Sequence, residues 1–257
     1  MNIISIIPAR MASSRFPGKP MKNILGMPMI GHVYKRVKMN KSLSEVYVAT
    51  CDREIFDYIA SIGGKAIMTG NFHERCSDRC AEAMLKIEKE SGSKCDIIVM
   101  VQGDEPLTFP QMIDEGIAPM INDKSVKITN LVADINSISA FENPNEVKVV
   151  MDKNNNALYF SREPIPSRKK GSLSVPMKKQ VCVISFTRDF LLEYNKMIPT
   201  PLEIIESVDM MRAIENGFNV KMCETSFVTK AVDNQEDLNE VCNMMADDLL
   251  YKTYIKN

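Results

Sequence analysis

Three positively charged side chains lie close together near the start of the chain. Arg10, Arg15 and Lys19 follow an apolar, β-branched run over residues 3–7, which is typical of a buried parallel strand. Open α/β sheets bind their ligands beyond the carboxyl ends of such strands. Guanidinium forks and an ammonium, with hydroxyls and loop N–H groups between them, favour a polyphosphate, although a solvated basic loop is the alternative on these residues alone. The loop lacks both the Walker pattern and G-x-G-x-x-G.

Two carboxylates follow another apolar run. Residues 96–101 predict a buried strand, and the turn over residues 102–106 comes directly after it with Asp104 and Glu105. A carboxylate pair at a strand end is a natural Mg²⁺ anchor, because Mg²⁺ favours one or two carboxylates plus phosphates and water. A simple turn is the alternative.

Arg75 and Arg79 flank the start of a helix that we predict over residues 78–90, with Ser77 as its cap. They indicate either a second anion site or solvated surface arginines.

The first hundred residues alternate between strand and helix patterns. Strands are predicted over 45–50, 65–68 and 96–101, with helices ending near 39 and spanning 53–61 and 78–90. Such alternation predicts an α/β fold with a mostly parallel central sheet.

The second half of the chain is less regular. A hairpin over 146–151 and 157–162, a strand over 181–186 and a mobile loop over 163–176 fall within an expected insertion of about residues 126–190, which would cover the crevice or pair two subunits. A helix over 201–216, a strand over 220–222 and a final helix capped by Asp233 follow. We expect one domain over 1–257.

Composition excludes several classes of protein. The 257 residues carry a net charge of −1, which argues against a nucleic-acid partner. No apolar run approaches the ~20 residues of a membrane span. Seven cysteines without a C-x-x-C pair predict reduced thiols and a cytoplasmic location.

Together, these segments resemble a known family. Pro8-Ala9-Arg10, with Ser13, Arg15 and Lys19-Pro20, resembles the CTP loop of the sugar-acid cytidylyltransferases. Residues 102–106, 141–150, 157–162, 201–203 and 232–238 are similar to the branch that activates 3-deoxy-manno-octulosonate (Kdo), the CMP-Kdo synthetases of lipopolysaccharide biosynthesis. The matches keep their order and cover nearly the whole chain.

The resemblance implies a Rossmann-like nucleotidyltransferase domain with a small inserted β/α lid or dimerisation segment. It also implies that a sugar-acid hydroxyl attacks the α-phosphorus of CTP and releases pyrophosphate, without a histidine base. Mg²⁺ would be held by Asp104 and Asp233, with a second metal ion possible. The catalytic side chains would be Arg10, Arg15, Lys19 and Asp104. The nucleotide would contact Pro8, Ala9, Arg10, Ser13, Arg15, Lys19, Arg79 and Gln102.

The acceptor half departs from the family pattern. Gln180 and Ile184 stand where the family has a sugar-facing His and Tyr, and residues 75–79 keep only the final Arg of Ser-Gly-Thr-Glu-Arg. The acceptor would be Kdo or a Kdo-like acid, with another octulosonic or nonulosonic acid or a phosphonate as the alternative. The residues expected to bind it are Arg75, Arg162, Gln180, Glu203 and Glu206. A UTP-dependent enzyme and a catalytically silent nucleotide-binding homologue are two further hypotheses. The resemblance also implies a homodimer.

Overall fold

The computed structural model describes residues 1–12, 15–171 and 174–255. The chain divides into two compact units, which are described separately. The first unit joins Met1–Asp114 to Val228–Asn257, and the second is Glu115–Phe227. The expected insertion of about residues 126–190 falls within the second unit.

A parallel sheet forms the centre of the first unit. Its strands run in the order β6 (Ile97–Val101), β1 (Ile3–Ala9), β4 (Glu45–Thr50) and β5 (Lys65–Met68), all parallel to their neighbours. Every residue of β1 and β6 is buried, because helices cover both faces of the sheet. The predicted strands over 45–50 and 65–68 are confirmed with the same bounds, and so is the α/β class.

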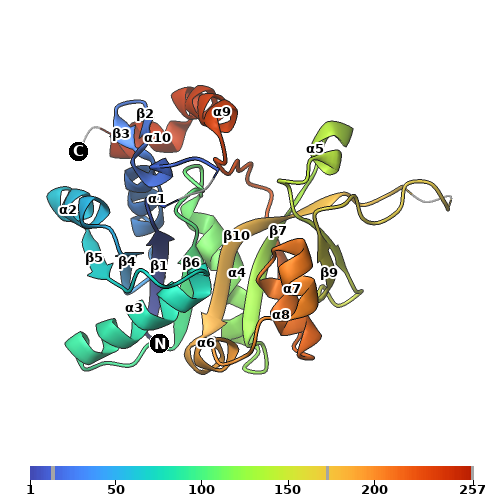
Figure 1. The fold of residues 1–257 in the computed structure, drawn as a ribbon, viewed down its shortest axis with the longest axis horizontal. Coiled ribbons are helices and arrows are strands. Elements are labelled where there is room, and N and C mark those ends of the chain that lie inside the picture. Colours follow the sequence, from blue (N-terminus) through green and yellow to red (C-terminus); the bar gives the residue numbers. More distant parts are fainter. Residues whose placement is uncertain (13–14, 172–173, 256–257) are drawn as a thin grey trace. The chain divides into compact units, whose positions relative to one another are not determined.

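The helices of this unit pack on the strands that precede and follow them. α1 (Met29–Lys38) and α2 (Arg53–Ser61) contact β1, β4 and β5, and α3 (Cys76–Ser91) crosses back over the strands toward β6, as Figure 1 shows. α3 begins earlier than predicted. Arg75 occupies its N-cap position, and Ser77 lies fully buried in its first turn, so the prediction that Ser77 caps the helix is wrong.

A smaller apolar cluster lies beside the sheet in the first unit. It joins the short hairpin of β2 (Asn23–Ile24) and β3 (Met27–Pro28) to α9 (Gln235–Asp247), through the buried side chains of Ile24, Met29, Leu107, Val232, Leu238, Val241 and Met245. The N-cap of α9 is Asn234, whose side chain accepts the N–H of Asp237. The prediction that Asp233 caps this helix is therefore wrong.

Buried polar groups fasten α10 (Leu249–Tyr254) to α1. His32 is fully buried, with Nε2 2.8 Å from the Ile24 carbonyl oxygen and Nδ1 2.8 Å from the Tyr254 hydroxyl. Because a carbonyl only accepts, Nε2 carries the proton in the neutral ring. Burial, aided by the nearby Arg36 guanidinium, lowers the pKa of His32 to about 4. Arg36 donates to Tyr254 and pairs with Asp248.

The second unit has a mixed arrangement of strands. β10 (Lys178–Thr187) runs antiparallel to β7 (Ile128–Asp134), and β11 (Lys221–Glu224) runs parallel to β7. β8 (Lys148–Met151) and β9 (Ala157–Ser161) form the predicted hairpin. The remaining helices are α4 (Pro110–Asn122), which contains the boundary between the units, α5 (Ile138–Glu142) and α6 (Arg188–Tyr194).

The single helix predicted over 201–216 is wrong, because the chain forms two helices. α7 (Pro201–Glu206) and α8 (Met210–Glu215) are separated by Ser207, whose φ of 53° is left-handed. The break allows Glu203 to bind Arg212 with both carboxylate oxygens, at 2.6 and 2.7 Å. In one continuous helix these residues would be about 13 Å apart along the axis. Among the helices of the described residues, none has the length and apolar composition needed to cross a membrane.

Candidate active site

The basic loop after β1 is closed at its base by backbone hydrogen bonds. The N–H of Gly18 donates to the Met11 carbonyl oxygen at 3.1 Å. Gly18 has a φ of 70°, a conformation that favours glycine, and it precedes the short 3-10 helix η1 (Lys19–Met21). This turn sends Lys19 back toward the carboxyl end of the sheet.

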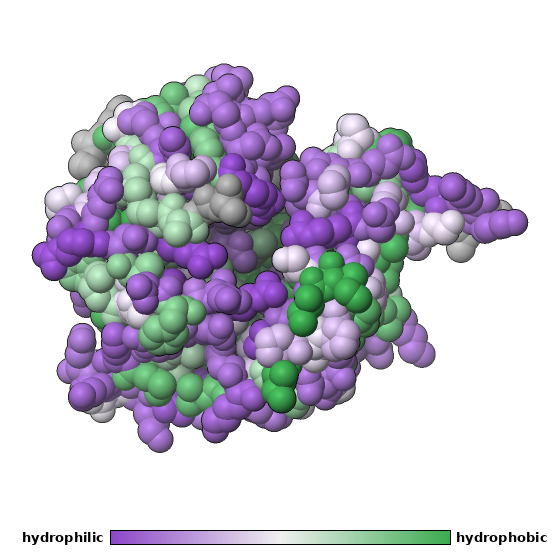
Figure 2. Space-filling view, in the orientation of Figure 1, coloured by the Kyte–Doolittle hydropathy of each residue, from purple (hydrophilic) through white to green (hydrophobic). Residues whose placement is uncertain are grey.

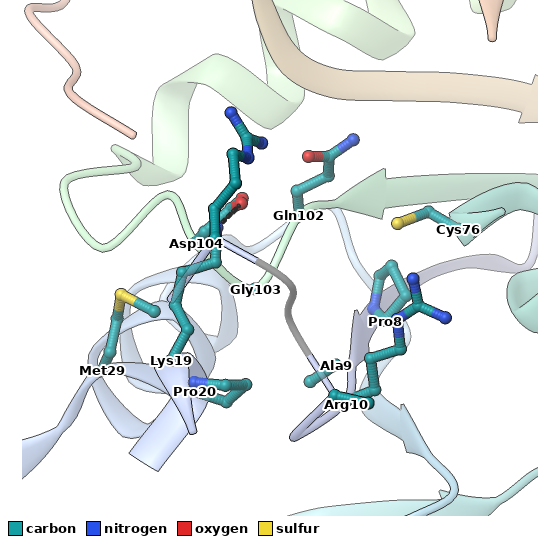
Figure 3. A pocket seen from close by; sticks show the side chains of 12 residues that line it. Pro8, Ala9, Arg10, Lys19, Pro20, Met29, Cys76, Gln102, Gly103 and Asp104 are labelled. Atoms are coloured by element: carbon teal, nitrogen blue, oxygen red, sulfur yellow. Dashed lines mark hydrogen bonds and ion pairs between the residues drawn. The ribbon is translucent and has the colours of Figure 1, made fainter. Parts of the chain in front are cut away.

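A cavity of about 270 Å³ opens at the ends of β1 and β6. Six of the residues predicted for the nucleotide line it: Pro8, Ala9, Arg10, Arg15, Lys19 and Gln102. Asp104, which was predicted for the metal ion, lines it too, beside Gln102 in Figure 3. Ser13 lies outside the described residues. The strand-end position inferred from sequence is therefore where these side chains meet.

Lys19 lies between two aspartates that are far apart in sequence. Its Nζ is 2.6 Å from Asp104 Oδ2 and 3.1 Å from Asp233 Oδ1, and Arg15 Nη1 is 2.9 Å from Asp233 Oδ2. Burial alone would lower the pKa of Lys19, but the two carboxylates more than offset this effect and raise its pKa above the usual value. Lys19 therefore remains an ammonium at neutral pH.

Asp233 reaches this position through its neighbour in the chain. The N–H of Val232 donates to the Asp104 carbonyl oxygen at 3.0 Å, and the Val232 side chain is fully buried in the apolar cluster with α9. The N–H of Asp233 then donates to Asp237 Oδ2 at 2.9 Å. Because the cap of α9 is Asn234, the Asp233 carboxylate is available to the two cations.

The carboxylate pair suits a divalent cation. Asp104 Oδ1 is buried and has no hydrogen-bond partner among the described residues, although a buried acceptor is normally satisfied. The described residues contain no cluster of three or more His, Cys, Asp or Glu that could hold a metal ion. Two carboxylates with further oxygens from phosphates and water are a typical Mg²⁺ ligand set, so the residues present fit this ion.

The arginines predicted near the nucleotide have different surroundings. Arg10 lines the cavity and donates to the His73 carbonyl oxygen at 3.2 Å. Arg79 is 3% exposed and donates to the Thr69 hydroxyl and to the Gly70 carbonyl oxygen. It is not among the residues that line the cavity. In this structure Arg79 supports the segment before α3.

Five lining residues were not among the predicted site residues: Ala12, Pro20, Met29, Cys76 and Gly103. Gly103 is needed for close packing, because a Cβ there would lie 3.0 Å from the Pro8 carbonyl oxygen and 3.2 Å from Ile30 Cδ1. The glycine between Gln102 and Asp104 was the available signal. The first residues of α1 and α3, which bring Met29 and Cys76 to the cavity, carry no comparable signal.

In the second unit, Arg162 and Glu206 bind neighbouring parts of the chain. Arg162 donates through its guanidinium to the carbonyl oxygens of Glu206, Pro144 and Ser207, at 2.7, 2.8 and 3.3 Å. The Glu206 carboxylate accepts hydrogen bonds from the hydroxyls of Tyr159 and Ser161 and from the N–H of Arg162. These bonds hold β9 against the end of α7.

The other predicted acceptor residues are also engaged. Glu203 is fully buried against Arg212, and Gln180 Nε2 donates to Asn130 Oδ1 at 2.6 Å. Arg75 lies at the N-cap position of α3 in the first unit. Acceptor binding by these residues stays a prediction.

A parallel α/β sheet whose strand ends carry a cation-lined cavity and a carboxylate pair has the arrangement expected of a nucleotidyltransferase. Residues 4–244 match the family model described as cytidylyltransferase. The chain therefore belongs to the cytidylyltransferase family, and it is an enzyme of the nucleotidyltransferase class.

Several relatives narrow the comparison. The chain is 43% identical over 256 residues to a 3-deoxy-manno-octulosonate cytidylyltransferase from Geobacter metallireducens, covering 96% of this chain and 98% of the relative. It is 41% identical to the protein of that name from Fusobacterium nucleatum, with 96% and 98% covered. A solved CMP:2-keto-3-deoxy-manno-octonic acid synthetase complexed with CTP superposes with a TM-score of 0.88 at 36% identity, over 97% of this chain and 100% of that one. The predicted resemblance to the CMP-Kdo synthetases is confirmed.

Proposed function

We propose that this protein transfers CMP from CTP to a 2-keto-3-deoxy sugar acid, with Kdo as the first candidate, and releases pyrophosphate. One observation carries the proposal. The loop with Arg15 and Lys19, the turn with Asp104 and the segment with Asp233 meet at the cavity or at its edge, where both cations pair with the carboxylates. These are the groups that a triphosphate and its counterion require.

The chemistry follows from the charges that develop during transfer. A hydroxyl oxygen of the acceptor forms a bond to the α-phosphorus of CTP, and the bond from that phosphorus to the bridging oxygen breaks as pyrophosphate leaves. Negative charge grows on the leaving group and on the non-bridging oxygens. Arg10, Arg15 and Lys19 line the cavity and would bind these oxygens, so that catalysis depends on positioning and electrostatic stabilisation.

Asp104 and Asp233 are the residues that would hold Mg²⁺. The bound ion would neutralise phosphate charge and lower the pKa of the attacking hydroxyl. Lys19 now pairs with both carboxylates, and its flexible ammonium would transfer to the phosphates when the carboxylates bind the ion. The buried, unpartnered Asp104 Oδ1 supports this assignment.

The relatives support Kdo as the acceptor, since those that match along nearly the whole chain are named for it. A different octulosonic or nonulosonic acid, or a phosphonate, is the alternative suggested by the altered strand β10. Ile184 is 2% exposed and Gln180 is bonded to Asn130, so neither reproduces the His and Tyr of the family pattern.

We expect the enzyme to act in the cytoplasm as a homodimer and to supply an activated sugar acid for lipopolysaccharide synthesis. Figure 2 shows an apolar patch over α7, where Ile204 and Ile205 are 62% and 73% exposed. Leu158 on β9 is also exposed. These side chains offer apolar surface to a second subunit, and light scattering of the purified protein would give its mass in solution.

Pyrophosphate release tests the proposal directly. The purified protein is mixed with CTP, Mg²⁺ and a panel of acids that contains Kdo, other 2-keto-3-deoxy acids and phosphonates, and UTP replaces CTP in a parallel series. Turnover with CTP and Kdo, lost when Mg²⁺ is chelated, is the expected result. Turnover with UTP alone would contradict the assigned nucleotide. CTP-dependent thermal stabilisation without turnover on any acid would indicate a silent nucleotide-binding homologue.

A further inference from the structure

A carboxylate outside the reacting groups holds the start of the nucleotide loop. β1 and β4 pair in parallel up to Ala9 and Thr50, where the backbone ladder ends. Two residues beyond this pair, Asp52 Oδ2 accepts the N–H of Met11 at 2.8 Å. The side chain of Asp52 thus binds a backbone N–H just beyond the end of this ladder.

Asp52 does not play the role that its position in the sequence suggests. It is the N-cap residue of α2, where an aspartate normally accepts an N–H of its own helix, but its side chain makes no such bond. The backbone of Asp52 is instead fixed on both sides. Its N–H donates to Thr50 Oγ1 at 3.1 Å, and its carbonyl oxygen accepts the N–H of Phe56 at 3.1 Å. The carboxylate is therefore held rigidly toward Met11.

Met11 is the base of the basic loop. Its N–H is bound by Asp52 and its carbonyl oxygen accepts the N–H of Gly18, so both backbone groups of this one residue are fixed. Arg10 precedes Met11, and Arg15 and Lys19 follow it within a few residues. All three line the cavity.

Asp52 is not among the residues that line the cavity, so its carboxylate acts on the site through the Met11 N–H. A hydrogen bond to an ionised acceptor is shorter and roughly twice as strong as a neutral one. If the loop is already held in its binding conformation, less conformational entropy is lost when the nucleotide binds. The benefit of Asp52 is thus expected in nucleotide affinity rather than in the chemical step.

We propose that Asp52 is a positioning residue of the nucleotide site, which orders the loop that carries Arg10, Arg15 and Lys19 by binding the Met11 N–H. Only the identity of CTP as ligand rests on the proposed function. The anchoring itself is a property of the protein alone, and it can be measured without any nucleotide.

Substitution at Asp52 separates anchoring from charge. Asp52→Ala removes the acceptor, whereas Asp52→Asn keeps an acceptor oxygen and removes the charge. We expect Asp52→Ala to raise the KM for CTP about tenfold, with kcat within about twofold of wild type. Asp52→Asn is expected to raise the KM less than Asp52→Ala does, because its neutral oxygen keeps a weaker hydrogen bond to Met11. Asp57→Ala, which removes an exposed carboxylate from the same helix, is the matched control and should change neither constant.

Hydrogen exchange of the Met11 amide supplies a readout that needs no substrate. Exchange should accelerate at least about tenfold in Asp52→Ala, clearly less in Asp52→Asn, and stay near wild type in Asp57→Ala. If Asp52→Ala does not fold, Asp52→Ser replaces it, because a serine can cap α2 but is too short to reach Met11. Unchanged exchange in the folded Ala or Ser variant, or equal loss of protection in the Asn variant, would overturn the proposal. Faster exchange together with an absence of CTP binding by the wild-type protein would leave the anchor standing and refute the proposed function.

Discussion

The two units use the same kinds of charged residue in different ways. In the first unit, Lys19 and Arg15 meet Asp104 and Asp233 around an open cavity, and Asp104 Oδ1 has no partner among the described residues. In the second unit, Arg162 binds backbone carbonyl oxygens, Glu203 binds Arg212, and Glu206 accepts from two hydroxyls and a backbone N–H. A charged cluster with unused bonding capacity at a cavity can exchange partners with a ligand, whereas a saturated buried one stabilises the fold.

Lys148 extends this comparison in the second unit. It is fully buried on β8, and its ammonium donates to the carbonyl oxygens of Asn143, Glu146 and Arg162. All three of its donors are therefore satisfied by loops at the end of the hairpin. Burial lowers the pKa of Lys148, in contrast to the raised pKa of Lys19 beside two carboxylates.

The largest effect is expected at the cavity. Asp104→Asn should lower kcat/KM for CTP by roughly a thousandfold, because it removes a negatively charged oxygen that would hold the Mg²⁺ counterion of the phosphates. The melting temperature should remain close to that of wild type. Steady-state kinetics and thermal unfolding check both results, and Asp57→Asn is the control for removal of an exposed carboxylate. Activity similar to wild type would show that the charged cluster at the cavity is not required for catalysis.

A substitution in the second unit should act on stability instead. Glu203→Gln leaves the buried Arg212 guanidinium without an ionic partner and should lower the free energy of unfolding by about 3 kcal/mol. The KM for the acceptor should be unchanged for the folded protein. Denaturant unfolding and acceptor titration measure the two quantities, with the exposed Glu193→Gln as control. A raised acceptor KM without loss of stability would show that Glu203 binds the acceptor after all.

The first unit also contains a buried polar region around His32, and unfolding at different pH values should reveal it. Its pKa is about 4 in the folded protein and 6.5 ordinarily, so between these values the unfolded chain binds a proton that the folded chain does not. The contribution of His32 to the free energy of unfolding is therefore fully present above pH 6.5. It is lost as the pH drops toward 4, by up to about 3 kcal/mol. Urea unfolding at several pH values would show this slope. His32→Gln should flatten it, and a slope that survives in this variant would assign the effect to other groups.

The smallest effect is expected for Arg15→Ala. The Arg15 guanidinium is about half exposed. The substitution should nevertheless raise the KM for CTP about tenfold, which corresponds to about 1.4 kcal/mol and exceeds the ~0–1 kcal/mol of a surface ion pair. Titration of CTP against the variant gives the KM. A change below twofold would mean that Arg15 only pairs with Asp233 and does not bind phosphate.

Local signals explain which parts of the fold could be predicted from the sequence. The strands β4 and β5 and the helix α2 follow from apolar runs bounded by polar residues, and their bounds were right. The predicted ranges of β1 and β6 differ from the observed ones by one or two residues. The break at Ser207 was missed because no glycine or proline marks it, and it depends on the buried contact between Glu203 and Arg212. The caps at Arg75 and Asn234 each differ by one or two residues from the predicted ones, within the usual uncertainty of helix ends.

Local sequence patterns could predict the charged residues of the site but not the long-range contacts between them. Cations after one strand and a carboxylate after another were visible, since both strands end at one edge of a parallel sheet. The bridge from Lys19 to Asp233 spans 214 residues, and no local pattern encodes it. Only the resemblance to the cytidylyltransferases placed Asp233 beside Asp104. The anchoring of Met11 by Asp52 was also hidden, because an aspartate before a helix looks like an ordinary cap.

The division of the first unit into two stretches of chain has a consequence for its biosynthesis. Asp104 belongs to Met1–Asp114, whereas Asp233 belongs to Val228–Asn257, and the whole second unit is translated between them. At ordinary elongation rates the ribosome needs roughly ten seconds to make that intervening stretch. Until then the nascent protein contains Lys19 and Asp104 but not Asp233. Translation products that end before Asp233 should therefore be unable to assemble the nucleotide site.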